Sequence, residues 1–274
     1  MKIKSAICPV ALIFITCFIS TEGQSENPPI EFLKKNFQDK DACFYMVDLD
    51  TGKTIYQLGR KRCIQKFEPC STFKLSLAAM AFDSGYFKSF DQTIKWDGKK
   101  YSRQSLNQNQ TPKRFLKYSV NWVGDLIVSH LGVARLKGYL KKFAFGDVAI
   151  KDGDSSSHIS HHLLKLSAHE QVSFIQTLWK GRLVSDKAFA KVKEVSEIKT
   201  ARNFKLYGKT GTGCIDPQCM SKPGRQLGWF IGVLVYKSKR YAFAANSSDL
   251  KPSTGYGGPK TMGVINLFFE KFYP

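Results

Sequence analysis

Residues 69–82 read PCSTFKLSLAAMAF, in which a serine and, three positions later, a lysine open an otherwise apolar stretch. Residues at i and i+3 lie on one face of a helix, about 5–6 Å apart at Cβ. A serine hydroxyl is a poor nucleophile until a base takes its proton, and a lysine amine that burial makes neutral can do so. The stretch therefore predicts a helix that begins at Ser71, with Ser71 and Lys74 as candidate nucleophile and general base.

The spacing alone is a weak signal. The same Ser-x-x-Lys pattern occurs at Ser196/Lys199 and at Ser248/Lys251, and only the copy at Ser71 precedes a long apolar run that can bury its lysine. An isolated motif of this kind more often marks a helix N-cap with a solvated lysine. The catalytic interpretation therefore needs a second, independent motif.

A second motif, Lys209-Thr210-Gly211, stands far downstream in a segment with the pattern of an apolar strand. Lys209 offers a cation and Thr210 a hydroxyl, and both are suited to a substrate carboxylate. Glycine at 211 permits close approach of a ligand to the backbone. Together with the first motif, this segment predicts a serine acyl-transfer enzyme.

The pattern of apolar residues divides the chain into strands at both ends and helices in the middle. A short helix is predicted over 29–37, and a hairpin over 42–59 with strands at 43–48 and 54–58. Further helices are predicted at 71–84, 119–131, 134–143, 167–180, 185–194 and 259–272, and further strands at 204–210, 228–236 and 241–246.

This order predicts a mixed α/β fold. An antiparallel sheet is built from both termini, is flanked by helices and carries an inserted all-helical lobe. We expect a single catalytic domain over residues 24–274, with a sheet lobe at about 24–70 and 202–274 and a helical lobe at about 71–201. The crevice between the two lobes is the expected place for a site.

The first 23 residues have the pattern of a secretory signal peptide. Lys2 and Lys4 precede an apolar run from Ala6 to Ile19, which is too short for a convincing membrane span, and small and polar residues follow. We expect cleavage after Gly23 and a secreted protein, most plausibly of the bacterial periplasm, with no membrane-spanning segment.

Export gives the cysteines a structural meaning, since disulfides persist outside the cytosol. Cys43 begins a predicted strand and Cys63 follows its predicted partner, which favours a bridge between them. Cys214 and Cys219 flank a proline-containing loop and form a candidate second bridge. Cys8 and Cys17 lie in the predicted signal peptide, which leaves five cysteines. The unpaired one, Cys70, is interpreted as a small buried hydrophobic residue rather than a reactive thiol.

The net charge of +20 raises the alternatives of a nucleic-acid partner or an anionic envelope polymer. The lysines and arginines are spread along the chain without an arginine-rich run or a nucleic-acid motif. We therefore expect no nucleic-acid partner and interpret the charge as favouring solubility and anionic substrates. A non-enzymatic, basic envelope-binding protein stays open as an alternative.

The motifs also resemble those of a known family, the class D (oxacillinase-type) serine β-lactamases of the penicillin-recognising group. Residues 69–74 match the family's nucleophile motif, and 94–98 (IKWDG) look like its Trp-Asp-Gly stretch. Residues 207–211 (YGKTG) are similar to its third motif, and 228–232 (GWFIG) to the strand that follows. The likeness runs in consistent order from about residue 40 to the C-terminus.

The resemblance implies roles for further residues. Ser119, in the stretch Tyr-Ser-Val-Asn-Trp, takes the place of a second serine that passes a proton to the leaving nitrogen, although a helix N-cap is the alternative. The backbone N–H groups of Ser71 and Thr212 would form the oxyanion hole. Lys260 stands where the family often has an arginine that holds the substrate carboxylate. Lys74 is expected to react with carbon dioxide to give a carbamate that acts as base.

Some positions depart from the family pattern. Asn121 replaces an apolar valine, Asp147 replaces an asparagine, and the loop 151–164 lacks the tryptophan that donates a hydrogen bond to the carbamate. His158 or Ile159 lies closest to the missing position in sequence. These departures favour acylation with slower deacylation as a variant of the mechanism.

A cluster of histidines, His158, His161 and His162, suggests a metal site at first sight. It lacks an ordered arrangement with acidic or cysteine ligands, so we expect no metal. The expected function is hydrolysis of β-lactam antibiotics through a serine acyl-enzyme, with no metal or organic cofactor. The alternatives are a penicillin-binding sensor or acyl trap, and a D-Ala-D-Ala peptidase.

Overall fold

The structure, a computed structural model, describes residues 27–146, 148–216, 219 and 223–274. The predicted signal peptide and Asp147 lie outside these ranges. Within them, no helix is both long enough and apolar enough to cross a membrane.

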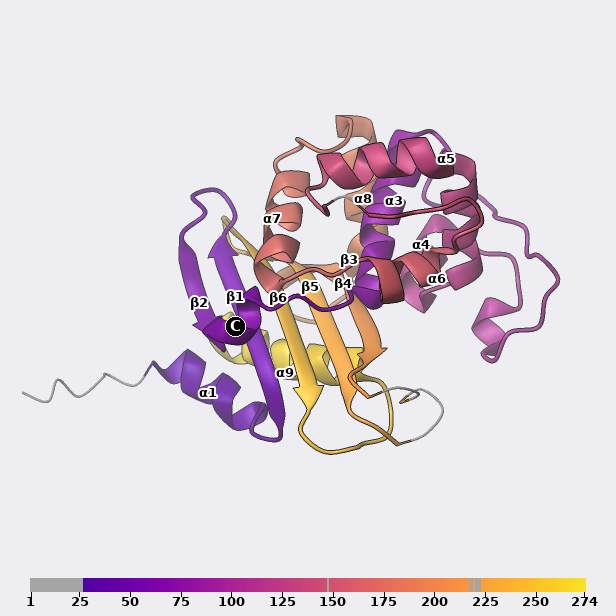
Figure 1. The fold of residues 1–274 in the computed structure, drawn as a ribbon. Helices are drawn as coiled ribbons and strands as arrows, with labels where there is room; N and C mark the ends of the chain where they lie inside the picture. Colours follow the sequence, from indigo (N-terminus) through magenta and orange to yellow (C-terminus); the bar gives the residue numbers. More distant parts are fainter. Residues whose placement is uncertain (1–26, 147, 217–218, 220–222) are drawn as a thin grey trace, which may run out of the picture.

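A six-stranded antiparallel sheet forms the centre of the molecule, with strand order β2-β1-β6-β5-β4-β3 (Figure 1). Its strands come from both ends of the chain: β1 (Lys40–Asp48), β2 (Thr54–Leu58), β3 (Glu197–Ile198), β4 (Phe204–Cys214), β5 (Gln226–Tyr236) and β6 (Lys239–Asp249). The N-terminal β1 pairs along its whole length with β6 near the C-terminus. This arrangement confirms the predicted fold class.

Helices cover both faces of the sheet (Figure 1). On one face lie α1 (Pro28–Asn36) and α9 (Gly257–Phe272), whose Phe268 and Phe269 enter an aromatic core with Phe44 and Phe243. On the other face, α7 (Ala168–Trp179) packs against β1, β5 and β6. Because β5 is covered on both sides, its side chains from Gln226 to Leu234 are all buried, and the strand has no polar alternation.

The remaining helices form the predicted helical part on the α7 side of the sheet. They are α3 (Phe73–Asp83), α4 (Pro112–Tyr118), α5 (Asn121–Lys142), α6 (Ser156–His158), the π-helix η3 (Ile159–Leu163) and α8 (Asp186–Ser196). Gly132, with φ +66°, interrupts α5, which agrees with the two helices expected there. No element was predicted at α4, at α2 (Arg60–Ile64) or at β3, which are short and lack a full apolar period.

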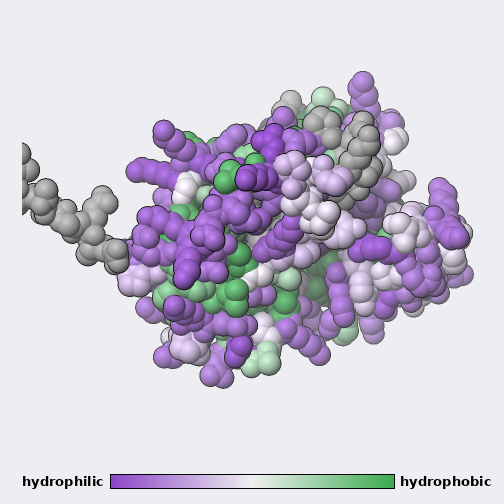
Figure 2. Space-filling view, turned by 90° about the horizontal axis from the view of Figure 1, so that it is seen from below, coloured by the Kyte–Doolittle hydropathy of each residue, from purple (hydrophilic) through white to green (hydrophobic). Residues whose placement is uncertain are grey.

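Two disulfides join Cys43 to Cys63 and Cys214 to Cys219, as predicted, and Cys70 is a buried free thiol. The first bridge ties β1 to α2, directly before the segment that carries Ser71. The second closes the loop at the end of β4. The face of the molecule shown in Figure 2 is mainly hydrophilic, with hydrophobic residues gathered in smaller patches.

Candidate active site

Ser71 lies in a tight 3-10 turn, η1 (Cys70–Thr72), directly before α3. The turn therefore replaces the first turn of the α-helix that the sequence predicted. Cys70 has φ +51°, a left-handed conformation that is costly for a residue with a Cβ. Such strain persists only where the surroundings hold the backbone in place.

Side chains from distant elements supply that support. Trp229 of β5 donates its indole N–H to the carbonyl of Glu68 at 2.9 Å. Gln171 of α7 donates to Thr72 Oγ1 at 2.9 Å, and this hydroxyl donates to the carbonyl of Pro69 at 2.7 Å. The turn is thus fixed from both the sheet and the helical part.

Lys74 points back along α3 toward Ser71, with 3.3 Å between Lys74 Nζ and Ser71 Oγ. Its side chain is only 3% exposed. The pKa of Lys74 is lowered to about 8, mainly by burial and to a smaller extent by the charge of Arg103, while Asp125 opposes the shift. The structure places the candidate nucleophile and base in contact, and the lowered pKa leaves part of the amine neutral near neutral pH.

Lys209 projects from β4 and is also buried. The pKa of Lys209 is lowered to about 7, mainly by burial and then by the charges of Lys74 and Arg103. Its ammonium group donates to the carbonyl of Thr210 at 2.9 Å. Two lysines thus share one dry region, and each disfavours the charge of the other.

Gly211 lies against the nucleophile turn. A Cβ at this position would stand 2.8 Å from the carbonyl oxygen of Pro69 and 3.2 Å from the backbone N of Thr72. The close approach that we expected from a ligand is thus made by the turn itself. Next to it, Thr212 Oγ1 accepts a hydrogen bond from the N–H of Gly258, at the start of α9, at 2.9 Å.

Ser119 follows α4 in a left-handed conformation, with φ +54°. The N-cap of α5 is Val120, so the alternative reading of Ser119 as an N-cap is wrong. Arg103 Nη2 donates to the carbonyl of the preceding residue, Tyr118, at 2.7 Å. Within the described residues Ser119 makes no hydrogen bond to Ser71, Lys74 or Lys209, and its role as a proton shuttle stays a prediction.

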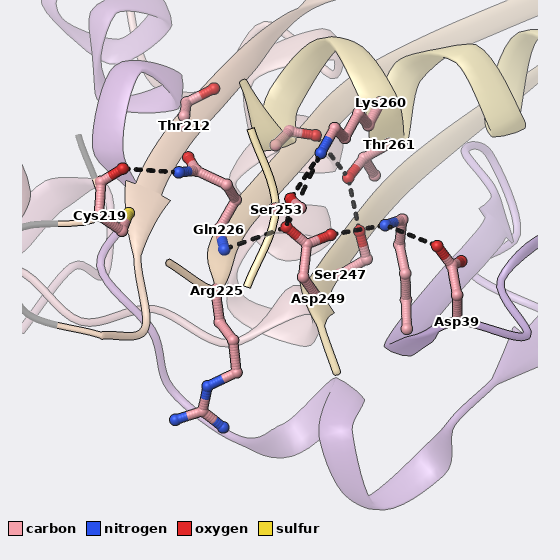
Figure 3. Close-up of polar contacts among 12 residues, drawn as sticks. Asp39, Thr212, Cys219, Arg225, Gln226, Ser247, Asp249, Ser253, Lys260 and Thr261 are labelled. Atoms are coloured by element: carbon pink, nitrogen blue, oxygen red, sulfur yellow. Dashed lines mark hydrogen bonds and ion pairs between the residues drawn. The ribbon is translucent and has the colours of Figure 1, made fainter. Parts of the chain in front are cut away.

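Lys260 of α9 contacts residues at and just after the end of β6 (Figure 3). Its Nζ donates to Ser253 Oγ at 2.8 Å and lies 3.8 Å from Asp249 Oδ2. An internal carboxylate therefore already faces this ammonium group. The contacts give no support to the predicted role of Lys260 in holding a substrate carboxylate.

Within the segment 151–164, residues 156–163 form α6 and η3. Its first histidine, His158, is 47% exposed and lies 3.7 Å from Asp154, so it does not take the place of the missing donor. Ile159 is fully buried. His161 is the histidine near Lys74: burial, and then the charge of Lys74, lower the pKa of His161 to about 4. Neutral His161 is a functional candidate that the sequence pattern missed.

Asp125 of α5 is a second candidate that the sequence did not indicate. It accepts hydrogen bonds from the backbone N–H and the hydroxyl of Ser156 at 2.8 and 2.7 Å, and it raises the pKa of Lys74. Asn121, which replaces the family's valine, is exposed, and its backbone carbonyl accepts from the hydroxyl of Ser156 at 3.3 Å. Asp125, one turn further along α5, is the carboxylate that acts on Lys74.

An open pocket of about 680 Å³ lies beside the nucleophile turn. It is bounded by η1 and η3 on one side and by the end of β4 on the other. The residues that line it are Glu68, Cys70, Asn121, Ser157, His161, His162, Gly213, Cys214, Ile215 and Asp216. The pocket thus lies against Cys70, the neighbour of Ser71, while Ser71 itself is not among its lining residues.

Comparison with known proteins agrees with this geometry. Residues 42–268 match the penicillin binding protein transpeptidase domain. The chain is 32% identical over 244 residues to Beta-lactamase OXA-1 of Escherichia coli, which covers 85% of this chain and 83% of that protein. A class D β-lactamase structure from Bacillus subtilis superimposes with a TM-score of 0.75 at 25% identity, covering 88% of this chain and 94% of the other.

The fold and the buried serine–lysine pair thus define a penicillin-recognising serine protein. The chain belongs to the transpeptidase domain family of penicillin-binding proteins, and within it to the class D serine β-lactamases. It is also 27% identical, over 97% of its length, to the Methicillin resistance mecR1 protein of Staphylococcus aureus. In that case it spans 45% of the longer relative.

Proposed function

We propose that this protein hydrolyses β-lactam antibiotics through a covalent acyl-enzyme on Ser71. The observation that carries the proposal is the 3.3 Å contact between Ser71 Oγ and the buried Nζ of Lys74, whose pKa of about 8 leaves part of the amine neutral. Membership of the class D family supports the same reaction.

In the first half-reaction, Lys74 takes the proton of Ser71, and the serine oxygen forms a bond to the lactam carbonyl carbon. The backbone N–H groups of Ser71 and Thr212 are the proposed oxyanion donors. The carbon–nitrogen bond of the ring then breaks, and Ser119 passes a proton to the departing nitrogen. The ring-opened substrate stays attached to Ser71 as an ester.

In the second half-reaction, Lys74 takes a proton from water, which attacks the ester carbonyl and releases the product acid and the serine hydroxyl. We propose that carbon dioxide adds to the neutral amine of Lys74 to give a carbamate, a stronger base at neutral pH than a protonated amine. Burial of Lys74 fits this addition, and neutral His161 is the nearby group able to donate an N–H. The negative charge of Asp125 opposes it.

A second candidate function is an acyl trap or sensor. It is favoured by the likeness to the mecR1 protein and by the absence of a tryptophan from residues 151–164. In this case Ser71 would react as above, but water would not remove the acyl group.

We further propose that the protein is exported to the bacterial periplasm after removal of residues 1–23. The apolar segment near the N-terminus and the two bridges, Cys43–Cys63 and Cys214–Cys219, support this. We propose that the reaction needs no metal or organic cofactor. Within the described ranges no three His, Cys, Asp or Glu side chains are grouped to hold a metal ion.

Mass spectrometry of the intact protein after addition of benzylpenicillin tests the proposal. We expect an adduct of the mass of the antibiotic that disappears as hydrolysed product accumulates. A persistent adduct without product would favour the trap, and no adduct would contradict both functions.

A Ser71→Ala variant should form no adduct while it keeps its circular dichroism spectrum. Ser196→Ala is the matched control, because Ser196 has the same spacing to a lysine but its hydroxyl contacts only the carbonyl of Lys193. We expect this control to turn over like the native protein.

A further inference from the structure

The reaction proposed above needs a cation for the carboxylate of the β-lactam, and neither lysine assigned to this task is well suited to it. Lys260 is held by Ser253 and Asp249. Lys209, with a pKa of about 7, is mostly uncharged above neutral pH in the free protein. A further positive charge at the site would supply what these two lysines do not.

Arg103 lies at the edge of the site, on the segment that connects α3 to α4. An antiparallel bridge between Ile94 and Gln110 closes this segment at its base, with 2.9 Å in both directions. Inside it, Trp122 of α5 donates its indole N–H to the carbonyl of Leu106 at 3.1 Å. The backbone around Arg103 is therefore anchored to the helical part rather than loose.

The guanidinium of Arg103 is oriented by one of its own donors. Nη2 binds the carbonyl of Tyr118 at 2.7 Å, which brings the group next to Ser119. Its charge is close enough to lower the pKa of both Lys74 and Lys209. Arg103 thus lies near three residues of the proposed reaction, although it comes from a different segment than any of them.

Arg103 has no carboxylate partner within ion-pair distance among the described residues, and it is exposed. A guanidinium has five N–H donors, so four remain after the bond to Tyr118. Its planar fork fits a carboxylate in a bidentate manner.

We propose that Arg103 is a specificity-determining residue that binds the carboxylate of the β-lactam substrate from the helical side of the site. This inference rests on the proposed hydrolysis. In this arrangement the segment between α3 and α4 recognises anionic substrates. Lys209 and Thr210 complete the contact from β4.

The test compares one substrate that carries the carboxylate with one that lacks its charge. Benzylpenicillin and its methyl ester are reacted with the native enzyme and with Arg103→Gln, and kcat/KM for acylation is measured for both. We expect a loss of about 10- to 100-fold for benzylpenicillin, the range for a hydrogen bond to a charged group, and less than about threefold for the ester. Arg103→Lys should fall between native and Arg103→Gln, since it keeps the charge without the fork.

The ester also separates substrate binding from an effect on the catalytic lysines. Removal of Arg103 is expected to raise the pKa of Lys74 and Lys209. The change at Lys74 acts on both substrates alike, so rates are compared on the plateau of each pH profile. A more fully charged Lys209 would favour only benzylpenicillin and would therefore oppose the expected loss. An equal loss for both substrates, or no loss for either, would overturn the inference.

Two further variants complete the design. Lys100→Gln removes a charge from an exposed neighbour whose side chain makes no hydrogen bond or ion pair within the described residues, and we expect it to act as native. If Lys260→Gln rather than Arg103→Gln discriminates between the two substrates, the inference is wrong. Absence of an acyl adduct in the native enzyme would contradict the proposed function itself, independently of Arg103.

Discussion

Lys74 and Lys209 are two buried amines whose charged forms are disfavoured by the same dry surroundings. Both side chains are almost fully buried, and the charge of Lys74 lowers the pKa of Lys209. A solvated lysine is protonated at neutral pH and cannot act as a base. Burial is thus the physical reason why the spacing of Ser71 and Lys74 has chemical meaning here.

The pKa of about 8 for Lys74 predicts a specific pH profile. Because this value is lowered from 10.5, the neutral base is present above about pH 8 and is lost as the pH falls through it. In buffer free of carbon dioxide, acylation by a β-lactam should therefore rise with pH and level off above about 8. The rate is measured in stopped-flow experiments with a chromogenic cephalosporin.

Added bicarbonate provides the second arm of this experiment. If Lys74 forms a carbamate, bicarbonate should extend activity to lower pH and speed the release of the acyl group. A rate that ignores bicarbonate would contradict the modification. A rate that still rises near pH 10 would contradict the lowered pKa.

At the scale of elements, the site depends on how closely η1 packs against β4. A Cβ on Gly213 would lie 2.5 Å from the sulfur of Cys70, the residue that carries the strained φ. The thiol of Cys70 is buried and donates to the carbonyl of Glu68 at 3.3 Å. Neither partner has room to move away without shifting the turn that holds Ser71.

We expect Gly213→Ala to lower the free energy of unfolding by about 1–3 kcal/mol, as overpacking does. In a Cys70→Ala background the same substitution should cost about 1 kcal/mol less, since the clashing sulfur is gone. Urea denaturation of the four proteins measures both values. Strictly additive effects would show that the two residues do not compete for the same space.

Gly138→Ala is the matched control for this cycle. Gly138 lies exposed on α5, and an added Cβ meets nothing within 4 Å. In this helical setting alanine should be neutral or stabilising by up to about 1 kcal/mol.

At the scale of the whole molecule, Asp249 joins the two ends of the chain (Figure 3). This carboxylate, 6% exposed, accepts from Lys40 of β1 at 2.6 Å, from the backbone of Gln226 in β5 at 3.2 Å and from Ser253 at 2.5 Å. Lys260 of α9 approaches it as well. The N-terminal strand β1 thus meets β5, the end of β6 and α9 of the C-terminal part at one side chain.

An Asp249→Asn variant should lower the free energy of unfolding by up to about 3 kcal/mol at neutral pH, because it leaves the largely buried ammonium of Lys40 with only the exposed carboxylate of Asp39, 3.5 Å away, as counter-charge. Burial alone would raise the pKa of Asp249, but the hydrogen bonds from Lys40, Ser253 and Gln226 hold it below the ordinary value. Its contribution is therefore present above the ordinary carboxylate pKa and is lost as the pH falls through the lowered one.

Denaturation of the native protein and of Asp249→Asn between neutral and acid pH measures this contribution. The difference between their free energies of unfolding should shrink toward low pH. Asp39→Asn is the control, since Asp39 also contacts Lys40 but is 73% exposed. We expect it to change stability by less than about 0.5 kcal/mol. An equal effect of the two variants would contradict the role of Asp249.

The site could be predicted from the sequence only in part, and the reason lies in the range of the interactions. Ser71 and Lys74 are three positions apart, and helical geometry brings such residues together whatever the rest of the chain does. His161 and Arg103 reach Lys74 from other segments. Their places depend on a π-helix and on an anchored connection, and neither has a periodic signature. The sequence pointed only to His158 or Ile159 as nearest the missing tryptophan, because position along the chain does not fix the direction of a side chain in such a segment.

The sequence by itself determined the local and the patterned features: the strands and helices with a clear apolar period, the order of the motifs and the choice of disulfide partners. Each of these depends on neighbours along the chain or on one face of one element. Only the tertiary structure decided which cations are free and which are paired. It tied Lys260 to Asp249 and left Arg103 beside Ser119, because burial and ion pairing depend on groups that the fold brings together from distant segments.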